Sequence, residues 1–180
     1  GNITWDVVQG ETATILQNCD NGNLAPIDWS KLNKDDYIPI AVQKCGMGTI
    51  ISSSVIAYNG DAFSGDKPQT VADFWDVKKF PGKRGMRKKA ITTLEFALMA
   101  DGVKAADVYA QLSTPEGVER AFKKLDEIKS NVVWWESSSS APQLLGSGEV
   151  TMSAAWSGRV IAAIRDEKKN FVINWDGQLY

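Results

Sequence analysis

The chain has 180 residues and a mass of 19.7 kDa, which suits one compact domain, or one lobe and part of a second. Apolar residues make up 43% and charged residues 23%, which excludes a disordered, collagen-like or coiled-coil chain. Twenty basic and twenty-two acidic side chains give a net charge of -2, so no global field favours nucleic acid. Apolar stretches fall far short of the roughly 20 residues that a membrane-spanning helix needs.

Two residue counts narrow the function further. The sequence contains no histidine, which removes the usual zinc ligand, the commonest general base and the Ser-His and Cys-His nucleophile pairs. We therefore expect neither a metal nor a cofactor. Seven tryptophans are many for this length, and tryptophan forms both cores and walls that stack on ligands. The composition favours a binding protein over a hydrolase.

The chain opens with a strand pattern at residues 3–8, followed by a turn and a short helix from Thr12 to Gln17. A capped helical turn is predicted at residues 26–32, and residues 49–58 form a β-rich run long enough to cross between two lobes as a hinge. No initiator methionine or apolar signal segment precedes the first strand, and a strand at residues 171–175 comes close to the other end. We expect a piece of a longer polypeptide, with sheet partners missing at both ends.

Helices and strands alternate between residues 70 and 175. Thr70 caps a short amphipathic helix, and a second helix runs from Lys89 or Ala90 to Asp101, where Gly102 stops it. The remaining helices are predicted at residues 103–112, 115–128, 141–145 and 157–168, and the remaining strands at residues 131–135, 150–154 and 171–175. This alternation predicts an α/β fold with a largely parallel sheet and with ligand loops at the carboxyl ends of the strands.

Several runs follow a known pattern in order and spacing. They are Asp6-Val7-Val8, Trp29 with Tyr37-Ile38-Pro39, Ala57-Tyr58-Asn59, Thr70 to Trp75, Lys79 to Gly85, Gly148-Glu149-Val150 and Ala155 to Arg159. Together they resemble the middle of an extracellular solute-binding protein of an ABC importer, in the polyamine-binding (spermidine/putrescine) branch. The resemblance implies a two-lobed, type II periplasmic-binding-protein-like fold. Residues 1–47 would be a remnant of the first lobe, 48–175 the second lobe, and 176–180 the start of a return crossing.

The resemblance also implies a role. The protein would be a periplasmic receptor, exported by a signal peptide outside this chain, that captures a small solute between its lobes and presents it to a membrane permease. It would not be an enzyme, because no bond is made or broken. A fragment of such a protein would expose sheet edges, which favours a dimer.

The strongest site candidates lie in turns that follow strands. Trp156, Ser157 and Arg159 form a strand-to-helix turn, and in the resembled family the tryptophan of this turn stacks on the ligand, a contact worth roughly 0.5 to 2 kcal/mol. The alternative is a core tryptophan beneath the helix. Glu11 and Thr12 follow the first strand, where they either meet an ammonium group or only cap a helix.

Two aromatic pairs supply further candidates. In Trp134-Trp135 one side chain should face the ligand and the other the core, because side chains alternate along a strand, and we place Trp135 in the site. Trp175 and Asp176 would add a wall and a carboxylate near the hinge. The tryptophans at positions 5, 29 and 75 are assigned to packing.

One departure from the family bears on the ligand. Polyamine binders carry acidic residues just before the second-lobe helix, whereas this chain has the basic residues Lys83, Arg84, Arg87, Lys88 and Lys89. Cations there would repel a diamine and, with Thr92 at a helix start, favour an anion, unless the loop is simply solvated. A polyamine, an anionic solute and a neutral solute therefore all stay open as ligands.

The cysteines allow two interpretations. In an exported protein Cys19 and Cys45 fit a disulfide, which would stabilise the fold by roughly 3.5 kcal/mol in the chain-entropy model. The alternative is a free Cys45 nucleophile, as in transferases such as thiaminase that share the two-lobed fold. No histidine is present to activate it, so we predict the disulfide.

Overall fold

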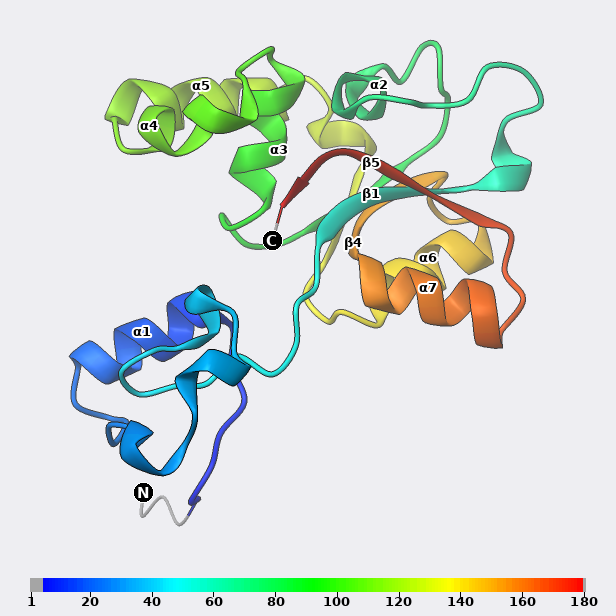
Figure 1. Cartoon of the computed structure of the whole chain (residues 1–180). Helices are drawn as coiled ribbons and strands as arrows, with labels where there is room; N and C mark the ends of the chain where they lie inside the picture. Colours follow the sequence, from blue (N-terminus) through cyan, green and yellow to red (C-terminus); the bar gives the residue numbers. More distant parts are fainter. Residues whose placement is uncertain (1–4, 180) are drawn as a thin grey trace. The chain divides into compact units, whose positions relative to one another are not determined.

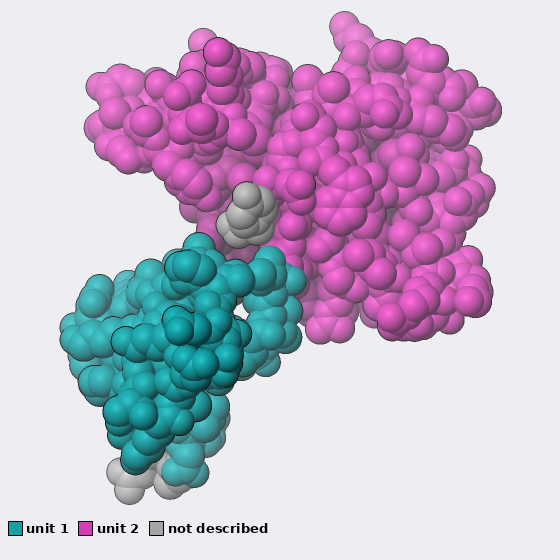
Figure 2. All heavy atoms as spheres, viewed as in Figure 1, with its two compact units in different colours: residues 1–51 teal, residues 52–180 magenta. Residues whose placement is uncertain are grey.

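A computed structural model describes residues 5–179 of the chain (Figure 1). The chain divides into two compact units, Gly1–Ile51 and Ser52–Tyr180, which Figure 2 shows in separate colours. The division falls at residue 51, near the expected boundary at residue 47, and residues 176–179 belong to a strand of the second unit. Within residues 5–179 no helix is both long and apolar enough to cross a membrane.

Unit 1 is held together by a short helix and a disulfide. Helix α1 (Thr12–Asp20) forms where the sequence predicted a helix, and the Cys19–Cys45 bond ties its last turn to the loop that ends the unit, with a Cα–Cα distance of 5.6 Å. The predicted disulfide is thus confirmed. Because Cys45 is oxidised in it, this residue cannot act as a free nucleophile. The unit also contains three 3-10 helices, Trp29–Lys31, Lys34–Asp36 and Pro39–Ala41.

The strand predicted at residues 3–8 is wrong where it can be compared with the structure. Residues 5–8 form no strand, and residues 1–4 lie outside the described part. Trp5 is 77% exposed, so its assignment to packing is wrong as well, whereas Trp29 and Trp75 do pack and donate their indole N–H groups to the Gln43 and Lys124 carbonyls. An alternating pattern becomes a strand only when a second strand pairs with it.

Unit 2 is built on a five-stranded sheet with the order β3-β2-β4-β1-β5. The strands span Ser54–Asn59 (β1), Arg84–Arg87 (β2), Val132–Trp135 (β3), Met152–Trp156 (β4) and Phe171–Leu179 (β5). Strand β2 pairs in parallel with β3 and β4, and β1 runs antiparallel to β4 and β5. The sheet is therefore mixed, with one strand opposed to the others.

Helices cover both faces of this sheet (Figure 1). They are α2 (Val71–Trp75), α3 (Thr93–Ala100), α4 (Val108–Leu112) and α5 (Pro115–Asp126) on one face and α6 (Ser140–Ser147) and α7 (Ser157–Asp166) on the other. Side chains alternate along each strand, so Met152 and Ala154 of β4 pack in the first core and Ala155 in the second. The unit consequently has one apolar core on each face. Three 3-10 helices, Gly60–Ala62, Ala105–Asp107 and Lys129–Asn131, join these elements.

Two predicted boundaries fail for the same reason. Strand β1 begins at Ser54 rather than at residue 49, because residues 49–53 have no strand beside them in the described structure. Helix α3 begins at Thr93 rather than at Lys89 or Ala90, and the preceding residues 84–87 form β2, a strand that the sequence did not reveal. Pairing with neighbouring strands, and not local propensity, decides both boundaries.

Arg84 is a core residue and not part of a solvated basic loop. Its side chain is 0% exposed, and its guanidinium donates hydrogen bonds to the carbonyl oxygens of Phe74 (2.7 Å), Phe80 (2.5 Å) and Gly82 (2.8 Å). Burial lowers the pKa of Arg84 to about 10, although the nearby carboxylate of Asp76 acts in the opposite direction. The guanidinium therefore fastens the end of α2 and the following loop to the sheet.

Candidate functional site

The carboxyl ends of three parallel strands meet at one edge of the sheet of unit 2. In the register of the sheet Arg87 at the end of β2 lies opposite Trp135 at the end of β3, and Trp156 at the end of β4 lies opposite Ser54 at the start of β1. Residues from separate parts of the chain are thereby brought to one edge. Loops at the carboxyl ends of the strands are where α/β sheets bind ligands.

The Trp156 turn is anchored by a neighbouring segment. Trp156 is the N-cap residue of α7, and the Ser157 N–H donates to the Ser53 carbonyl oxygen at 2.8 Å. The Ser53 N–H in turn donates to the Ser157 hydroxyl oxygen at 3.2 Å. Ser157 is buried, so its hydroxyl holds the turn in place. Trp156 itself is partly exposed, as a ligand-stacking residue must be.

Arg159 lies in the first turn of α7 and is exposed. The first turn of a helix presents backbone N–H groups that lack an acceptor within the helix, and it favours negative charge. A guanidinium in this position adds a bidentate donor for a carboxylate. The turn from Trp156 to Arg159 therefore combines an apolar ring with an anion-binding group.

The ring of Trp156 also contacts a cation from the neighbouring strand. The guanidinium carbon of Arg87 lies 5.0 Å from the centroid of the Trp156 ring, within the range of a cation–π interaction. Arg87 is only 5% exposed. The sequence analysis placed Arg87 in a basic loop, because a run of charged residues does not have the pattern of a strand. Strand β2 and the contact of Arg87 with Trp156 were therefore not predicted.

Thr92 and Thr93 shape the loop between β2 and α3. Thr92 has a φ of 69°, a left-handed conformation that is unusual for a β-branched residue. Such strain concentrates at functional sites. The Thr93 hydroxyl donates to the Arg87 carbonyl oxygen at 2.9 Å. Thr92 is partly exposed and stays a candidate ligand residue.

Trp134 and Trp135 point to opposite faces of the sheet, as alternation predicted. Trp135 is 5% exposed and packs in the core beneath α6 and α7, whereas Trp134 is 41% exposed. Of the two, the structure thus leaves Trp134 accessible, not the predicted Trp135. The sequence predicted that the two side chains lie on opposite faces, but it could not show which of the two is exposed.

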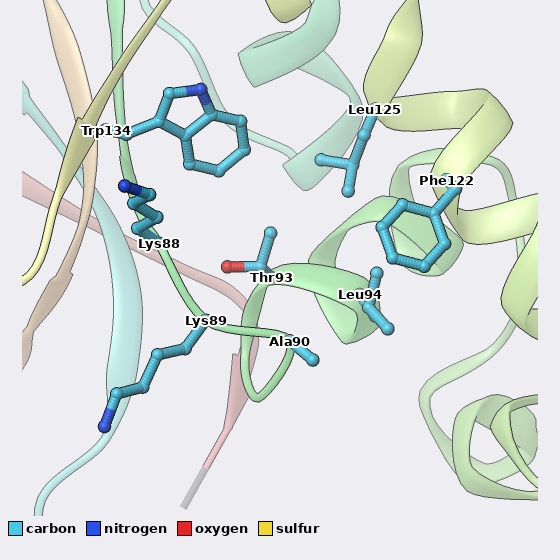
Figure 3. A pocket seen from close by; sticks show the side chains of 8 residues that line it. All are labelled: Lys88, Lys89, Ala90, Thr93, Leu94, Phe122, Leu125 and Trp134. Atoms are coloured by element: carbon cyan, nitrogen blue, oxygen red, sulfur yellow. The ribbon is translucent and has the colours of Figure 1, made fainter.

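A pocket of about 320 Å³ lies beside Trp134 (Figure 3). It is lined by Lys88, Lys89, Ala90, Thr93, Leu94, Phe122, Leu125 and Trp134. Trp134 from β3 and Phe122 from α5 stand on opposite sides of it (Figure 3). The Phe122 ring is exposed. Trp156 and Arg159 do not line this pocket.

The other predicted site residues lie elsewhere. Asp176 accepts a hydrogen bond from the Val71 N–H at 2.8 Å, so it binds the first turn of α2. Glu11 and Thr12 belong to unit 1, where Glu11 is the N-cap residue of α1 and its backbone carbonyl accepts from the Ile15 N–H at 3.0 Å. Residues 5–179 contain no cluster of three histidine, cysteine, aspartate or glutamate side chains that could hold a metal ion.

Comparison with known proteins gives matches over the whole chain. Residues 1–180 match the family described as bacterial extracellular solute-binding protein. The chain is 46% identical over 181 residues to the gamma-aminobutyric acid-binding protein of Pseudomonas aeruginosa. This alignment covers 100% of this chain and 51% of that protein.

Solved structures of relatives have the same fold. The periplasmic binding protein MotA of A. tumefaciens B6, solved in complex with glucopine, matches with a TM-score of 0.87 and 38% identity over 95% of this chain and 53% of that one. A GABA receptor matches with a TM-score of 0.84 and 36% identity over 96% of this chain and 52% of that one. The predicted α/β periplasmic-binding-protein fold is confirmed, and the chain spans about half the length of these relatives. The chain belongs to the family of bacterial extracellular solute-binding proteins.

Proposed function

We propose that this chain is part of a periplasmic receptor that binds a small solute of the γ-aminobutyric acid class, with one ammonium and one carboxylate group. The receptor hands this solute to the membrane permease of an ABC importer. The observation that carries the proposal is the turn at the end of β4, where the Trp156 ring and the Arg159 guanidinium lie three residues apart.

Each group of the turn has a defined task. The indole ring of Trp156 packs against the methylene chain of the solute. The Arg159 guanidinium pairs with the carboxylate, supported by backbone N–H groups of the first turn of α7. Ser157 fixes the turn through its two hydrogen bonds with Ser53. These groups bind and orient the solute without any bond being made or broken.

The cations at this edge argue against a polyamine. The Arg87 guanidinium contacts the Trp156 ring, and Arg159 follows Trp156 by three residues in the first turn of α7. Such charges repel an ammonium group and attract a carboxylate. The names of the relatives agree with this preference, since two of them are named for γ-aminobutyric acid and a third was solved with glucopine.

The first unit supplies the candidate partners of the ammonium group. Glu11 and Thr12 of unit 1 have the chemistry for this, a carboxylate and a hydroxyl. A solute that touches both lobes binds the closed form better than the open form and so shifts the population towards closure. The permease then recognises the closed form.

Three four-carbon compounds test the proposal. γ-Aminobutyrate carries an ammonium and a carboxylate, butyrate only the carboxylate, and putrescine two ammonium groups. We expect the full-length protein as encoded to bind γ-aminobutyrate in isothermal titration calorimetry, and to bind butyrate and putrescine at least about tenfold more weakly because each lacks one charge partner. Preferential binding of putrescine would refute the proposal.

Two substitutions locate the site. Trp156→Ala and Arg159→Met should each lower the affinity for γ-aminobutyrate about tenfold or more. Trp134→Ala is the matched control, because it removes an exposed tryptophan of the same unit that is outside the turn. If Trp134→Ala lowered the affinity as much as Trp156→Ala, the site would lie elsewhere.

A further inference from the structure

We infer that Asn21 is a modification site: it loses its side-chain amide through attack by the Gly22 backbone nitrogen and becomes aspartate or isoaspartate. The sequence contains two Asn-Gly pairs, Asn21-Gly22 and Asn59-Gly60. A glycine after asparagine favours this reaction, because it has no Cβ to obstruct the approach of its nitrogen. The structure distinguishes the two pairs, and the inference is independent of the proposed function.

The reaction needs water and no other reactant. The Gly22 nitrogen gives up its proton and forms a bond to Cγ of Asn21. The bond from Cγ to Nδ2 breaks, and the leaving group takes up a proton and departs as ammonia. Water then opens the resulting succinimide ring at one of its two carbonyl carbons. Opening at Cγ gives aspartate, and opening at the backbone carbonyl carbon gives isoaspartate, which adds one carbon to the main chain.

The way in which α1 ends places a glycine directly after Asn21. Asn21 is the C-cap residue of α1, and Gly22 has a φ of 73°, a left-handed conformation that glycine adopts without strain. The Gly22 N–H donates to the Cys19 carbonyl oxygen at 3.1 Å, and the Asn23 N–H donates to the Asn18 carbonyl oxygen at 2.9 Å. These are the two hydrogen bonds of a Schellman motif. The helix end therefore favours the same glycine that makes Asn21 reactive.

The turn after α1 is exposed and is held only by local hydrogen bonds. Asn21, Gly22 and Asn23 are all exposed, and no group within residues 5–179 forms a hydrogen bond with the Asn21 side chain. Helix α1 has nine residues, of which only Cys19 is buried, and so short a helix is marginally stable by itself. Opening of its last turn therefore costs little and frees the Gly22 nitrogen.

The second pair is held by hydrogen bonds to distant parts of the chain. The Asn59 N–H donates to the Thr151 carbonyl oxygen at 3.1 Å, and the Gly60 N–H donates to the Asn170 carbonyl oxygen at 2.7 Å. The Asn59 side-chain oxygen accepts from the Asp61 N–H at 3.0 Å. Asn59 also ends β1, a strand with neighbours on both sides. We expect this pair to react at least about tenfold more slowly than the first, because several hydrogen bonds must break together.

The modification should weaken the end of α1. Isoaspartate lengthens the main chain between residues 21 and 22, so the Gly22 and Asn23 N–H groups lose their alignment with their acceptors. Aspartate places a negative charge at the carboxyl end of the helix, which the helix dipole disfavours. Hydrogen exchange should therefore show less amide protection at Gly22 and Asn23 in the modified form, and equal protection would contradict this consequence.

Peptide mapping of the full-length protein as encoded tests the inference. The protein is incubated for several days at neutral and at mildly alkaline pH, then reduced and digested. Trypsin cleaves after Lys31 and Lys44, which puts Asn21 and Asn59 in different peptides. Fragment-ion mass spectrometry should find deamidation at Asn21 and at least about tenfold less at Asn59. The rate at Asn21 should rise with pH, because the attacking nitrogen must lose its proton.

The unfolded protein supplies the reference rate. In urea both pairs are released from the fold and should react at comparable rates. In the folded protein, Asn21→Gln should abolish the deamidation in its peptide, whereas Asn23→Gln, at an exposed asparagine that precedes Leu24, should leave it unchanged. Equal rates at Asn21 and Asn59 in the folded protein would overturn the inference. So would a rate at Asn21 that folding suppresses as strongly as the rate at Asn59.

Discussion

Ser53 and Ser157 are 104 residues apart in the sequence and form a reciprocal pair of hydrogen bonds. The Ser157 N–H donates to the Ser53 carbonyl at 2.8 Å, and the Ser53 N–H donates to the Ser157 hydroxyl at 3.2 Å. The pair joins the segment that enters β1 to the first residue of α7. The position of Trp156 is thereby coupled to the residues that connect the two units of the chain.

Ser157→Ala should weaken this coupling. The substitution leaves the Ser53 N–H without its acceptor, so we expect a loss of about 1 kcal/mol in the free energy of unfolding and a modest loss of affinity for γ-aminobutyrate. Urea unfolding and calorimetric titration measure the two effects. Ser137→Ala, at an exposed serine of the same edge, is the control. An unfolding midpoint equal to that of Ser137→Ala would show that the hydroxyl is dispensable.

Arg84→Met should be among the most destabilising single changes in unit 2. Methionine fills most of the volume of the side chain but leaves the Phe74, Phe80 and Gly82 carbonyl oxygens without their donor. Since each unsatisfied buried acceptor costs about 1 to 3 kcal/mol, we expect a loss of at least about 3 kcal/mol in the free energy of unfolding.

The control for Arg84→Met is Lys83→Met, which removes an exposed cation one residue earlier. Chemical denaturation of both variants should give a wild-type midpoint for Lys83→Met and a strongly lowered one for Arg84→Met. Equal midpoints would mean that water or a rearranged loop satisfies the three carbonyl oxygens.

Reduction of the Cys19–Cys45 disulfide should destabilise unit 1 selectively. The cross-link spans 26 positions of sequence, and its removal should lower the free energy of unfolding of this unit by about 3.5 kcal/mol. We expect no free thiol in the unreduced protein and two after reduction, measured by thiol titration. Loss of amide protection from hydrogen exchange should be confined to unit 1. Equal loss in both units would contradict the prediction.

Glu95 should make unit 2 less stable as the pH rises. Burial raises the pKa of Glu95 above its ordinary value of 4.5, although backbone hydrogen bonds from Glu95 and Thr92 oppose the shift. Below about pH 4.5 the Glu95 carboxyl is protonated in both the folded and the unfolded state, so it does not lower the free energy of unfolding. As the pH rises from 4.5 through the folded-state pKa, the free energy of unfolding falls, because the buried group must ionise.

Glu95→Gln cannot ionise, so its stability relative to the wild-type protein should increase between pH 4.5 and pH 8, and urea denaturation at several pH values measures this difference. Glu116→Gln, at an exposed glutamate in the first turn of α5, is the control. A difference between Glu95→Gln and the wild-type protein that is independent of pH would show that the Glu95 carboxyl titrates normally.

Local sequence was sufficient to predict a structural feature where one short segment contains all the groups that form it. The cap of α2 is an example, because the Thr70 hydroxyl accepts from the Asp73 N–H and the Asp73 carboxylate accepts from the Thr70 N–H, three residues away. The alternation of Trp134 and Trp135 needs only the geometry of a single strand. The family resemblance arose from such short runs taken in order. The match over the whole chain confirms the solute-binding family but not the polyamine-binding branch.

The sequence by itself thus determined the α/β class, most of the helices, the disulfide pair and the turn that contains Trp156. Tertiary structure alone decided that Arg84 to Arg87 form a strand, because the pairing partners come from β3 and β4, dozens of residues later in the chain. It also decided the roles of the two arginines. A buried guanidinium is stable only where distant segments bring carbonyl oxygens or an aromatic ring to it, and no local pattern can specify that arrangement.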